Sequence, residues 1–270
     1  MSIMKDSVTC LILSCDKFSD LWDGNIKLFN ENWPDKVFST YLVTDKPTDR
    51  TLPGVEILCA GEDVEWSDRL KFALQYVKTD YVFVTLDDYF LIERVDNAKM
   101  EDYLRLMIDG GYDYLRFYPR PKRATKEELV GHKGIYHVDP ACNYSVNLYS
   151  CYWTKKFLEY TVREPKNAWM FEISLSQQAM NFNAQCLCSY NDDYVILDVV
   201  RKGKILHKAD RFFKKHPGIY EGDRELQSWK YEVKLWVKTF CGRNTPTFLL
   251  PLFRKIYVFL GGESITNNGI

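Results

Sequence analysis

Two adjacent carboxylates, Asp87 and Asp88, directly follow the strand-like run from Tyr81 to Leu86. The run has no polar alternation, which is typical of a parallel strand buried on both faces. Burying a carboxylate there without a partner is costly, so the pair needs a cation or hydrogen bonds at the end of the strand. Mg²⁺ or Mn²⁺ holding a diphosphate meets that need, because hard cations combine one or two carboxylates with phosphate oxygens. The pair therefore predicts a metal and diphosphate site.

Acidic residues also end two other predicted strands. Asp16 follows the run from Val8 to Leu13, and Asp45 follows the run from Val37 to Val43. Ligands of open α/β sheets bind outside the carboxyl ends of the strands, so both acids are expected at the same edge as Asp88. A single Asp at a strand end is also typical of a helix cap or a turn, and that alternative stays open for both.

Several common site motifs are missing from the sequence. It contains no G-x-G-x-x-G, no G-x-x-x-x-G-K-[ST], no G-x-S-x-G and no H-E-x-x-H. The pattern therefore indicates neither a Rossmann dinucleotide site nor a P-loop, and it disfavours an α/β-hydrolase or a zincin. Carboxylate chemistry at strand ends remains.

Strand-like and helix-like segments alternate over the first 118 residues. The predicted strands are residues 8–13, 37–43, 55–58, 81–86 and 114–118. Helices are predicted to begin near Ser19 or Asp20, at Ser67 as an N-cap, and at Asn97. This alternation indicates right-handed β-α-β units, and hence an α/β fold with a mostly parallel sheet flanked by helices.

The pattern loosens after residue 119. A strand is predicted over 144–150, a short helix over 154–162 and a longer helix over 169–182. Residues 195–199 and 204–207 are predicted to pair as a hairpin across Arg201-Lys202-Gly203.

The charge of the chain is unevenly distributed. The formal net charge is -1, yet residues 201–260 hold 14 Lys and Arg against 5 Asp and Glu, a local balance of +9. Such a segment favours an anionic partner, or it is a solvated face that packs against the acidic body. Nucleic acid is not expected as that partner, because no recognised binding module is present.

We divide the chain into a catalytic domain, residues 1–222, and a basic, aromatic helical tail, residues 223–270. Apolar residues of the tail recur every three or four positions, at Leu226, Trp229, Val233, Trp236 and Phe240. A basic amphipathic helix containing Trp can lie in a membrane interface, or it can pack on the domain and expose its lysines. We expect peripheral contact with an anionic membrane rather than a span, because no segment reaches ~20 consecutive apolar residues.

The eight cysteines are expected to be reduced and structural. The first apolar run is too short for the core of a signal peptide. Cys186 and Cys188 are two positions apart, unlike the C-x-x-C of zinc and redox sites. These features predict a cytoplasmic protein, with the inner face of the cell membrane as its expected place of contact.

Three short stretches resemble one family. Trp66 to Leu70, Asp80 to Leu91 and Ala168 to Glu172 are similar to segments of bacterial GT-A-type glycosyltransferases from surface-polysaccharide clusters. The resemblance implies a GT-A-like fold, a nucleotide-sugar donor, Mn²⁺ or Mg²⁺, and a saccharide or lipid-linked acceptor. It also implies that Ser14, Asp16 and Asp45 hold the nucleoside, while Arg69 and Asp87 reach the donor. The family's metal motif has two acids spaced by one residue, whereas here Asp87 and Asp88 are adjacent.

Glu172 is the candidate catalytic base, and Trp169 is the candidate acceptor-binding residue. An inverting transferase needs a carboxylate within hydrogen-bond reach of the acceptor hydroxyl. An indole offers a flat face on which a sugar can stack. The alternative is that Glu172 sits in the first turn of a helix, favoured by the helix dipole, while Trp169 fills the core.

His207 is a candidate third metal ligand beside Asp87 and Asp88, although a lone His near basic residues is more often structural. A sugar nucleotidyltransferase is a rival function that would usually show a Gly-rich loop after the first strand, and Ser14-Cys15-Asp16-Lys17 has no glycine. A non-catalytic carbohydrate-binding or scaffold protein is a second rival.

Overall fold

The computed structural model describes residues 2–119 and 121–244. The chain divides into two compact units, residues 1–226 and residues 227–270, and the second is described as far as Asn244. The boundary lies close to the predicted one at residue 222.

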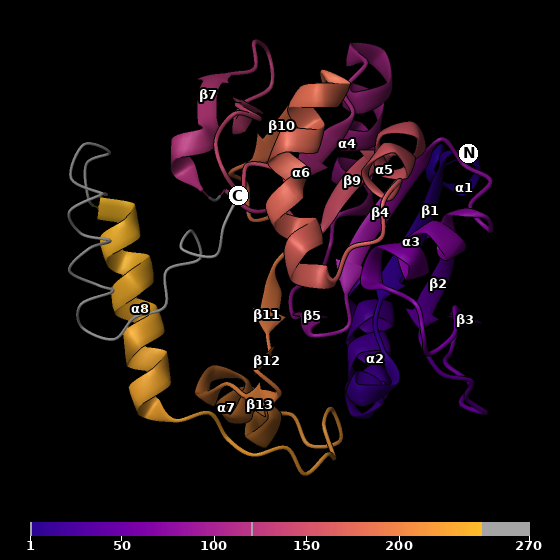
Figure 1. The fold of residues 1–270 in the computed structure, drawn as a ribbon, viewed down its shortest axis with the longest axis vertical. Helices are drawn as coiled ribbons and strands as arrows, with labels where there is room; N and C mark the ends of the chain where they lie inside the picture. The colour runs from indigo at the N-terminus through magenta and orange to yellow at the C-terminus, as the bar shows by residue number, and fades with distance from the viewer. Residues whose placement is uncertain (1, 120, 245–270) are drawn as a thin grey trace. The chain divides into compact units, whose positions relative to one another are not determined.

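In the described part of the first unit, nine strands form one sheet in the order β3-β2-β1-β4-β9-β6-β10-β8-β7 (Figure 1). The strands are β1 (Val8–Leu13), β2 (Ser39–Thr44), β3 (Glu56–Cys59), β4 (Tyr81–Leu86), β6 (Tyr114–Arg116), β7 (Thr125–Glu128), β8 (Ile135–Val138), β9 (Cys151–Thr154) and β10 (Cys186–Ser189). Strands β3, β2, β1 and β4 pair in parallel, and β6 pairs in parallel with β10. Strand β9 runs antiparallel to both β4 and β6, so β6 and β10 point in the same direction as β1 to β4. Strand β8 is antiparallel to both β10 and β7, and most strands of the sheet therefore share one direction, as expected.

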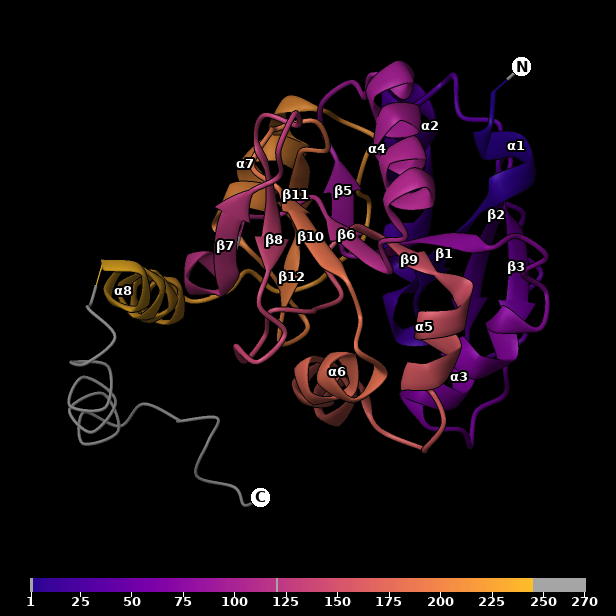
Figure 2. The same cartoon turned by 90° about the horizontal axis from the view of Figure 1, so that it is seen from above.

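Helices cover both faces of this sheet (Figure 2). Helices α2 (Trp22–Asn32) and α4 (Asn97–Gly110) pack on one face, while α3 (Trp66–Leu74), α5 (Lys155–Thr161) and α6 (Ala168–Phe182) pack on the other. Strand residues alternate between the two cores, because successive side chains of a strand point to opposite faces. Leu11 and Val84 join the α3–α6 side, and Cys10 and Phe83 join the α2–α4 side. The short helix α1 (Met4–Ser7) precedes the first strand.

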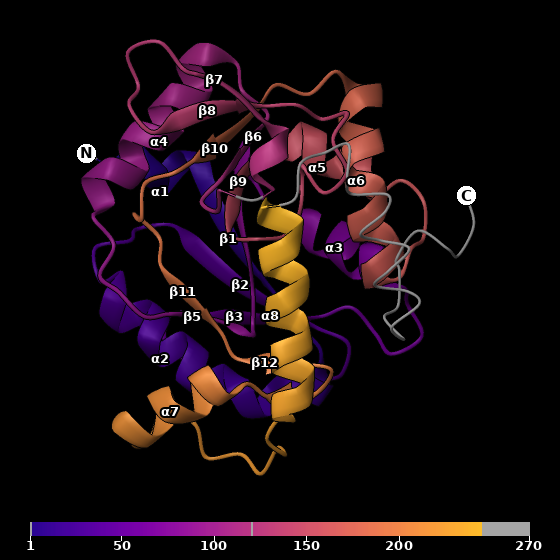
Figure 3. The ribbon, with the colours of Figure 1, turned by 90° about the vertical axis from the view of Figure 1, so that its left-hand side faces the viewer.

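A third, smaller core lies outside the main sheet. Strand β5 (Tyr89–Leu91) pairs antiparallel with β11 (Ile196–Asp198) (Figure 3). Strand β12 (Val200–Arg201) pairs with β13 (Lys204–Ile205) (Figure 1). Helix α7 (His207–Lys215) packs with them and with the 3-10 turn η1 (Asp16–Leu21). Residues after 195 therefore return to the segment that follows Asp88. The other 3-10 turn is η2 (Lys122–Ala124).

The strand predicted over 144–150 is wrong, because this segment is irregular and the strand begins only at Cys151. Its polar and apolar residues do alternate, but Ser145 and Asn147 are as buried as Val146. Side chains replace a ladder there: the amide of Asn147 donates to the hydroxyl of Tyr114 at 3.3 Å.

The hairpin predicted across Arg201-Lys202-Gly203 is present, but its paired strands are not residues 195–199 and 204–207 as predicted. Residues 196–198 pair with β5, and the hairpin joins Val200–Arg201 to Lys204–Ile205. Lys202 and Gly203 both have positive φ, at 53° and 78°, as a two-residue hairpin turn requires. Ser67 is not the N-cap of α3, since Glu65 holds that position.

The second unit contains helix α8 (Trp229–Asn244). Trp229, Val233 and Trp236 are 59%, 56% and 64% exposed. Phe240 lies beyond the residues whose side chains are described. Within the described residues, no helix is long and apolar enough to cross a membrane.

Candidate functional site

The carboxyl ends of β1 and β4 lie side by side, because Leu13 pairs with Leu86. This pairing brings Ser14 to Asp87, and the Ser14 hydroxyl donates a hydrogen bond to the Asp87 carboxylate. Trp22 Nε1 donates in turn to Ser14 Oγ at 2.7 Å. Asp87 is 6% exposed, and its backbone oxygen accepts from Asn25 Nδ2 at 3.0 Å. Asp87 is thus anchored into the edge of the sheet.

Asp45 ties the loops after β1 and β2 together. Its Oδ1 accepts from the amide of Asp16 at 2.7 Å, and its Oδ2 pairs with Arg69 Nη1 at 3.6 Å. The same Arg69 nitrogen lies 3.4 Å from the backbone oxygen of Ser14. Arg69 Nε is buried without a hydrogen-bond partner among the described residues. The structure therefore brings all the predicted donor-binding residues to one edge.

Asp88 lies at the corner between β4 and β5, where the chain meets β11. Its backbone oxygen accepts from the amide of Val199 at 3.0 Å. Asp198, the last residue of β11, pairs with Tyr89 in the register. Arg201 Nε donates to Asp198 Oδ2 at 2.8 Å. Asp198 and Arg201 therefore belong to this corner, and neither was predicted from the sequence.

Asp88, Asp198 and Arg201 form what we call the acidic corner. The pKa values of the carboxylates in and beside it are raised. Burial, and then the charge of Asp198, raise the pKa of Asp88 to about 7, while Arg201 opposes the shift. Burial, and then the charge of Asp88, raise the pKa of Asp87 well above its ordinary value. Carboxylates in such surroundings favour a bound cation or proton, because like charges removed from water repel strongly.

Glu172 lies one turn into α6 rather than in its first turn. The helix begins at Ala168, and the side chain of Asn167 caps it by accepting from the amide of Met170 at 2.9 Å. The helix-dipole explanation for Glu172 is therefore wrong. Burial raises the pKa of Glu172, and the positive charge of Arg201 partly offsets the shift. The charge of Arg201 thus acts on Glu172 as well as on Asp88.

Trp169 is 44% exposed, so the alternative in which it fills the core is also wrong. His207 is 7% exposed and begins α7. Among the described residues, no group of three or more His, Cys, Asp and Glu side chains is placed to hold a metal ion. A ligand set of Asp87, Asp88 and His207 therefore stays a prediction.

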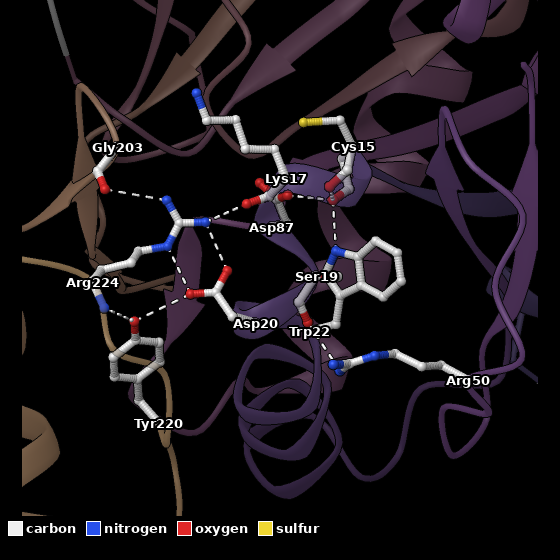
Figure 4. Close-up of polar contacts among 11 residues, drawn as sticks. Cys15, Lys17, Ser19, Asp20, Trp22, Arg50, Asp87, Gly203, Tyr220 and Arg224 are labelled. Atoms are coloured by element: carbon white, nitrogen blue, oxygen red, sulfur yellow. Dashed lines mark hydrogen bonds and ion pairs between the residues drawn. The ribbon is translucent and has the colours of Figure 1, made fainter. Parts of the chain in front are cut away.

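The strand ends that carry Ser14, Asp16, Asp45 and Asp87 are called the donor edge below. Arg224 comes from a distant part of the chain and contacts the segment that follows β1 at this edge (Figure 4). Its Nε and Nη2 donate to the two oxygens of Asp20 at 2.7 Å each, and Nη1 donates to the backbone oxygen of Gly203 at 3.2 Å. Tyr220 adds a hydrogen bond from its hydroxyl to Asp20 at 3.1 Å. The positive charge of Arg224 also lowers the pKa of Asp87 and Asp88 against the stronger effect of burial.

One feature of the sequence could have predicted a site role for Asp198. Asp198 directly follows the short apolar run Val195 to Leu197, as the pair Asp87-Asp88 directly follows β4. Nothing local assigns Arg224 or Asp20 to the site, since they are 204 residues apart.

No protein-family profile matches the sequence, and no curated protein does. Solved structures do resemble the fold. A mannosyltransferase from Pyrobaculum calidifontis in complex with GDP-Man and Mn²⁺ aligns with a TM-score of 0.50 at 12% identity, over 75% of this chain and 59% of that chain. TarS from S. aureus aligns at 0.47 with 11% identity, over 70% of this chain and 36% of that chain. A cytidylyltransferase from Leptospira borgpetersenii aligns at 0.44 with 11% identity, over 82% and 100%.

At these identities the likeness concerns the fold alone. It confirms the expected α/β, GT-A-like architecture with a mostly parallel sheet flanked by helices. The chain spans about a third of the length of TarS and three fifths of the length of the mannosyltransferase.

Proposed function

We propose that the protein is a glycosyltransferase that moves a sugar from a nucleotide-sugar donor to a saccharide or lipid-linked acceptor in surface-polysaccharide synthesis. The observation that carries this proposal is that the carboxyl ends of β1, β2 and β4 bring the predicted donor-binding residues to one edge of the sheet, next to Asp88, whose buried Oδ1 has no hydrogen-bond partner among the described residues. The charge of Arg201 acts on both Asp88 and Glu172, which lie 84 residues apart in the sequence, and this supports Glu172 as a base near the same edge.

The donor side is formed by the loops that follow β1, β2 and β4. Ser14, Asp16 and Asp45 present polar groups for the nucleoside, and Arg69 supplies a positive charge for the diphosphate. The buried Arg69 Nε, which has no hydrogen-bond partner among the described residues, supports this role, since an unsatisfied donor favours an acceptor from a ligand. Asp87 holds Ser14 in place beneath this site.

The acceptor side is formed by α6 and a group of tyrosines beside Asp88. Tyr118 and Tyr149 stack with ring centroids 4.1 Å apart, and Tyr149 packs against Tyr89 at 5.1 Å. These rings and the exposed Trp169 offer flat apolar faces, which suit a saccharide.

In the proposed reaction, Glu172 accepts the proton of the acceptor hydroxyl as its oxygen forms a bond to the anomeric carbon of the donor. The bond from that carbon to the diphosphate oxygen breaks, and the electron pair leaves with the nucleoside diphosphate. Attack from the face opposite the leaving group inverts the anomeric configuration. The raised pKa of Glu172 strengthens it as a base near neutral pH.

The acidic corner fits a divalent cation. Asp88 Oδ1 is buried and has no hydrogen-bond partner among the described residues, which suits a hard cation held by a carboxylate and phosphate oxygens. Mn²⁺ or Mg²⁺ bound there would neutralise the charge that develops on the leaving diphosphate. The roles of the other residues do not depend on the cation. Arg201 and Arg224 offset the negative charge of the carboxylates, and Glu172 accepts the proton.

The test is a thermal-shift panel of nucleotide sugars with and without Mn²⁺, followed by product analysis with the stabilising donor. We expect a donor to raise the melting temperature and to yield nucleoside diphosphate and a glycosylated acceptor. Release of pyrophosphate from a nucleoside triphosphate and a sugar 1-phosphate would instead show a nucleotidyltransferase. Donor binding with neither reaction would indicate a non-catalytic binding protein.

A further inference from the structure

We propose that Asp198 is the second carboxylate of the cation site, and that it binds the ion together with Asp88 in place of Asp87. This inference rests on the proposed function for the identity of the donor, but not for the binding of the ion. It names a ligand residue that the adjacent pair Asp87-Asp88 does not suggest.

The backbone brings Asp88 and Asp198 to the same corner from opposite halves of the chain. Strand β5 leaves the corner at Tyr89, and β11 arrives antiparallel to it with Asp198 paired to Tyr89. The amide of Val199 donates to the backbone oxygen of Asp88, which fixes the end of one strand against the start of the other.

Each of these carboxylates has one oxygen that the protein leaves unsatisfied. Asp88 Oδ1 and Asp198 Oδ1 are buried and have no hydrogen-bond partner among the described residues. Leaving a buried polar atom unpaired is costly, and more so for a charged group. Two such oxygens in one acidic corner favour the binding of a cation.

Arg201 does not fill this role, because it contacts the other oxygen of Asp198. Its Nε donates to Oδ2 at 2.8 Å, and its Nη2 lies 2.5 Å from the same atom. The guanidinium therefore orients the carboxylate from one side and leaves Oδ1 available. A positioning partner of this kind is a common feature of carboxylates that bind metals.

Asp87 is poorly suited to be the second ligand. One of its oxygens accepts the hydrogen bond from Ser14, which Trp22 orients in turn. This chain of contacts holds the carboxylate inside the edge of the sheet, where it is 6% exposed. Two carboxylates with diphosphate oxygens and water are a sufficient ligand set for Mg²⁺ or Mn²⁺.

The test is Mn²⁺ binding to the full-length protein without any nucleotide. Binding is measured from the electron paramagnetic resonance signal of the free ion. We expect Asp198→Asn and Asp88→Asn each to weaken Mn²⁺ binding at least ~10-fold, because each removes one charge from a hard-cation site. Asp35→Asn is the matched control: Asp35 also pairs with an arginine, Arg94 at 3.2 Å, but it is exposed and precedes β2 at the amino end of a strand. It should bind Mn²⁺ like the parent.

Asp87→Asn provides the contrast within the site. If it weakened Mn²⁺ binding while a correctly folded Asp198→Asn did not, Asp87 would be the second ligand and the inference would be wrong. Near-ultraviolet circular dichroism of each variant separates a lost ligand from a lost fold. Asp198→Glu, which keeps the charge, should retain more Mn²⁺ affinity than Asp198→Asn; equal affinities would point to a structural role. Mn²⁺ binding that depends on Asp198 without any sugar transfer would overturn the proposed function alone.

Discussion

The donor edge and the acidic corner are built in different ways, although they are adjacent. The donor edge comes from consecutive β-α units: β1, β2 and β4 end in the loops that carry Ser14, Asp45 and Asp87. The acidic corner joins Asp88 to residues that lie more than a hundred positions later, namely Asp198 and Arg201.

Because the two regions are built differently, we expect substitutions to affect them differently. The contacts of the donor edge are braced by a buried parallel sheet, whose strands are covered on both faces. The acidic corner rests on the three-residue pairing of β5 with β11 and on a two-residue hairpin. Substitutions in the corner are therefore expected to alter chemistry and ion binding, while substitutions that loosen the donor edge are expected to lower stability.

The largest expected effect is that of Glu172→Gln. Removing a general base typically lowers a rate by ~100-fold or more, so we expect transfer to fall by that factor. Donor affinity should stay close to that of the parent, because Glu172 belongs to the acceptor side. Product formation with a true acceptor, alongside donor titration by calorimetry, measures both quantities. Full transfer activity in this variant would show that another base or a retaining mechanism operates.

Asp88→Asn should weaken metal-dependent donor binding, by about tenfold or more. The change preserves the shape of the side chain but removes a charge from the proposed cation site. Donor titration by calorimetry with Mn²⁺ and with a chelator gives the effect. Normal binding of donor and metal would remove the acidic corner from the proposed site.

Arg224→Ala should destabilise the first unit by about 1–2 kcal/mol, because it removes paired hydrogen bonds to the carboxylate of Asp20. The melting temperature should fall by a few degrees. Arg94→Ala is the control, since its ion pair with Asp35 is exposed and such pairs contribute little. Equal effects from the two variants would show that Arg224 does not brace the donor edge.

The pH dependence of transfer should reflect the buried surroundings of Glu172. Burial raises its pKa, and the base must be deprotonated, so the rate should fall with decreasing pH at values above the ordinary range of Glu. Arg201→Gln should move this limb to still higher pH, because the offsetting positive charge is lost. The pH profile of kcat/KM tests both shifts. If the acidic limb of the pH profile stayed unchanged in Arg201→Gln, the charge of Arg201 would not act on the catalytic base.

The smallest expected effect lies in the tail. We propose that residues 223–270 make peripheral contact with an anionic membrane, on the basis of the exposed Trp229 and Trp236 and the Lys residues of α8. Truncation after Leu226 preserves Arg224, so it tests the tail without releasing the donor edge. Co-sedimentation with anionic vesicles should fall on truncation and at high salt, which screens the attraction. Negligible binding by the full-length protein would contradict this proposal.

The sequence by itself determined the α/β class, the three strands that end in acids, and the helix that carries Glu172. These features depend on local patterns: a buried parallel strand is apolar throughout, and a helix repeats its apolar face every three or four residues. The strand predicted over 144–150 was wrong because alternation also occurs where buried side chains replace backbone partners.

Only the tertiary structure decided which residues meet Asp88. Pairing between β5 and β11 depends on how distant segments pack, and no spacing in the sequence encodes it. The same holds for Arg224 on Asp20, where contact across 204 residues follows from the return of the chain around the third core. Local patterning fixes which face of a strand or helix is buried, whereas long-range packing selects the charged partners at the corner.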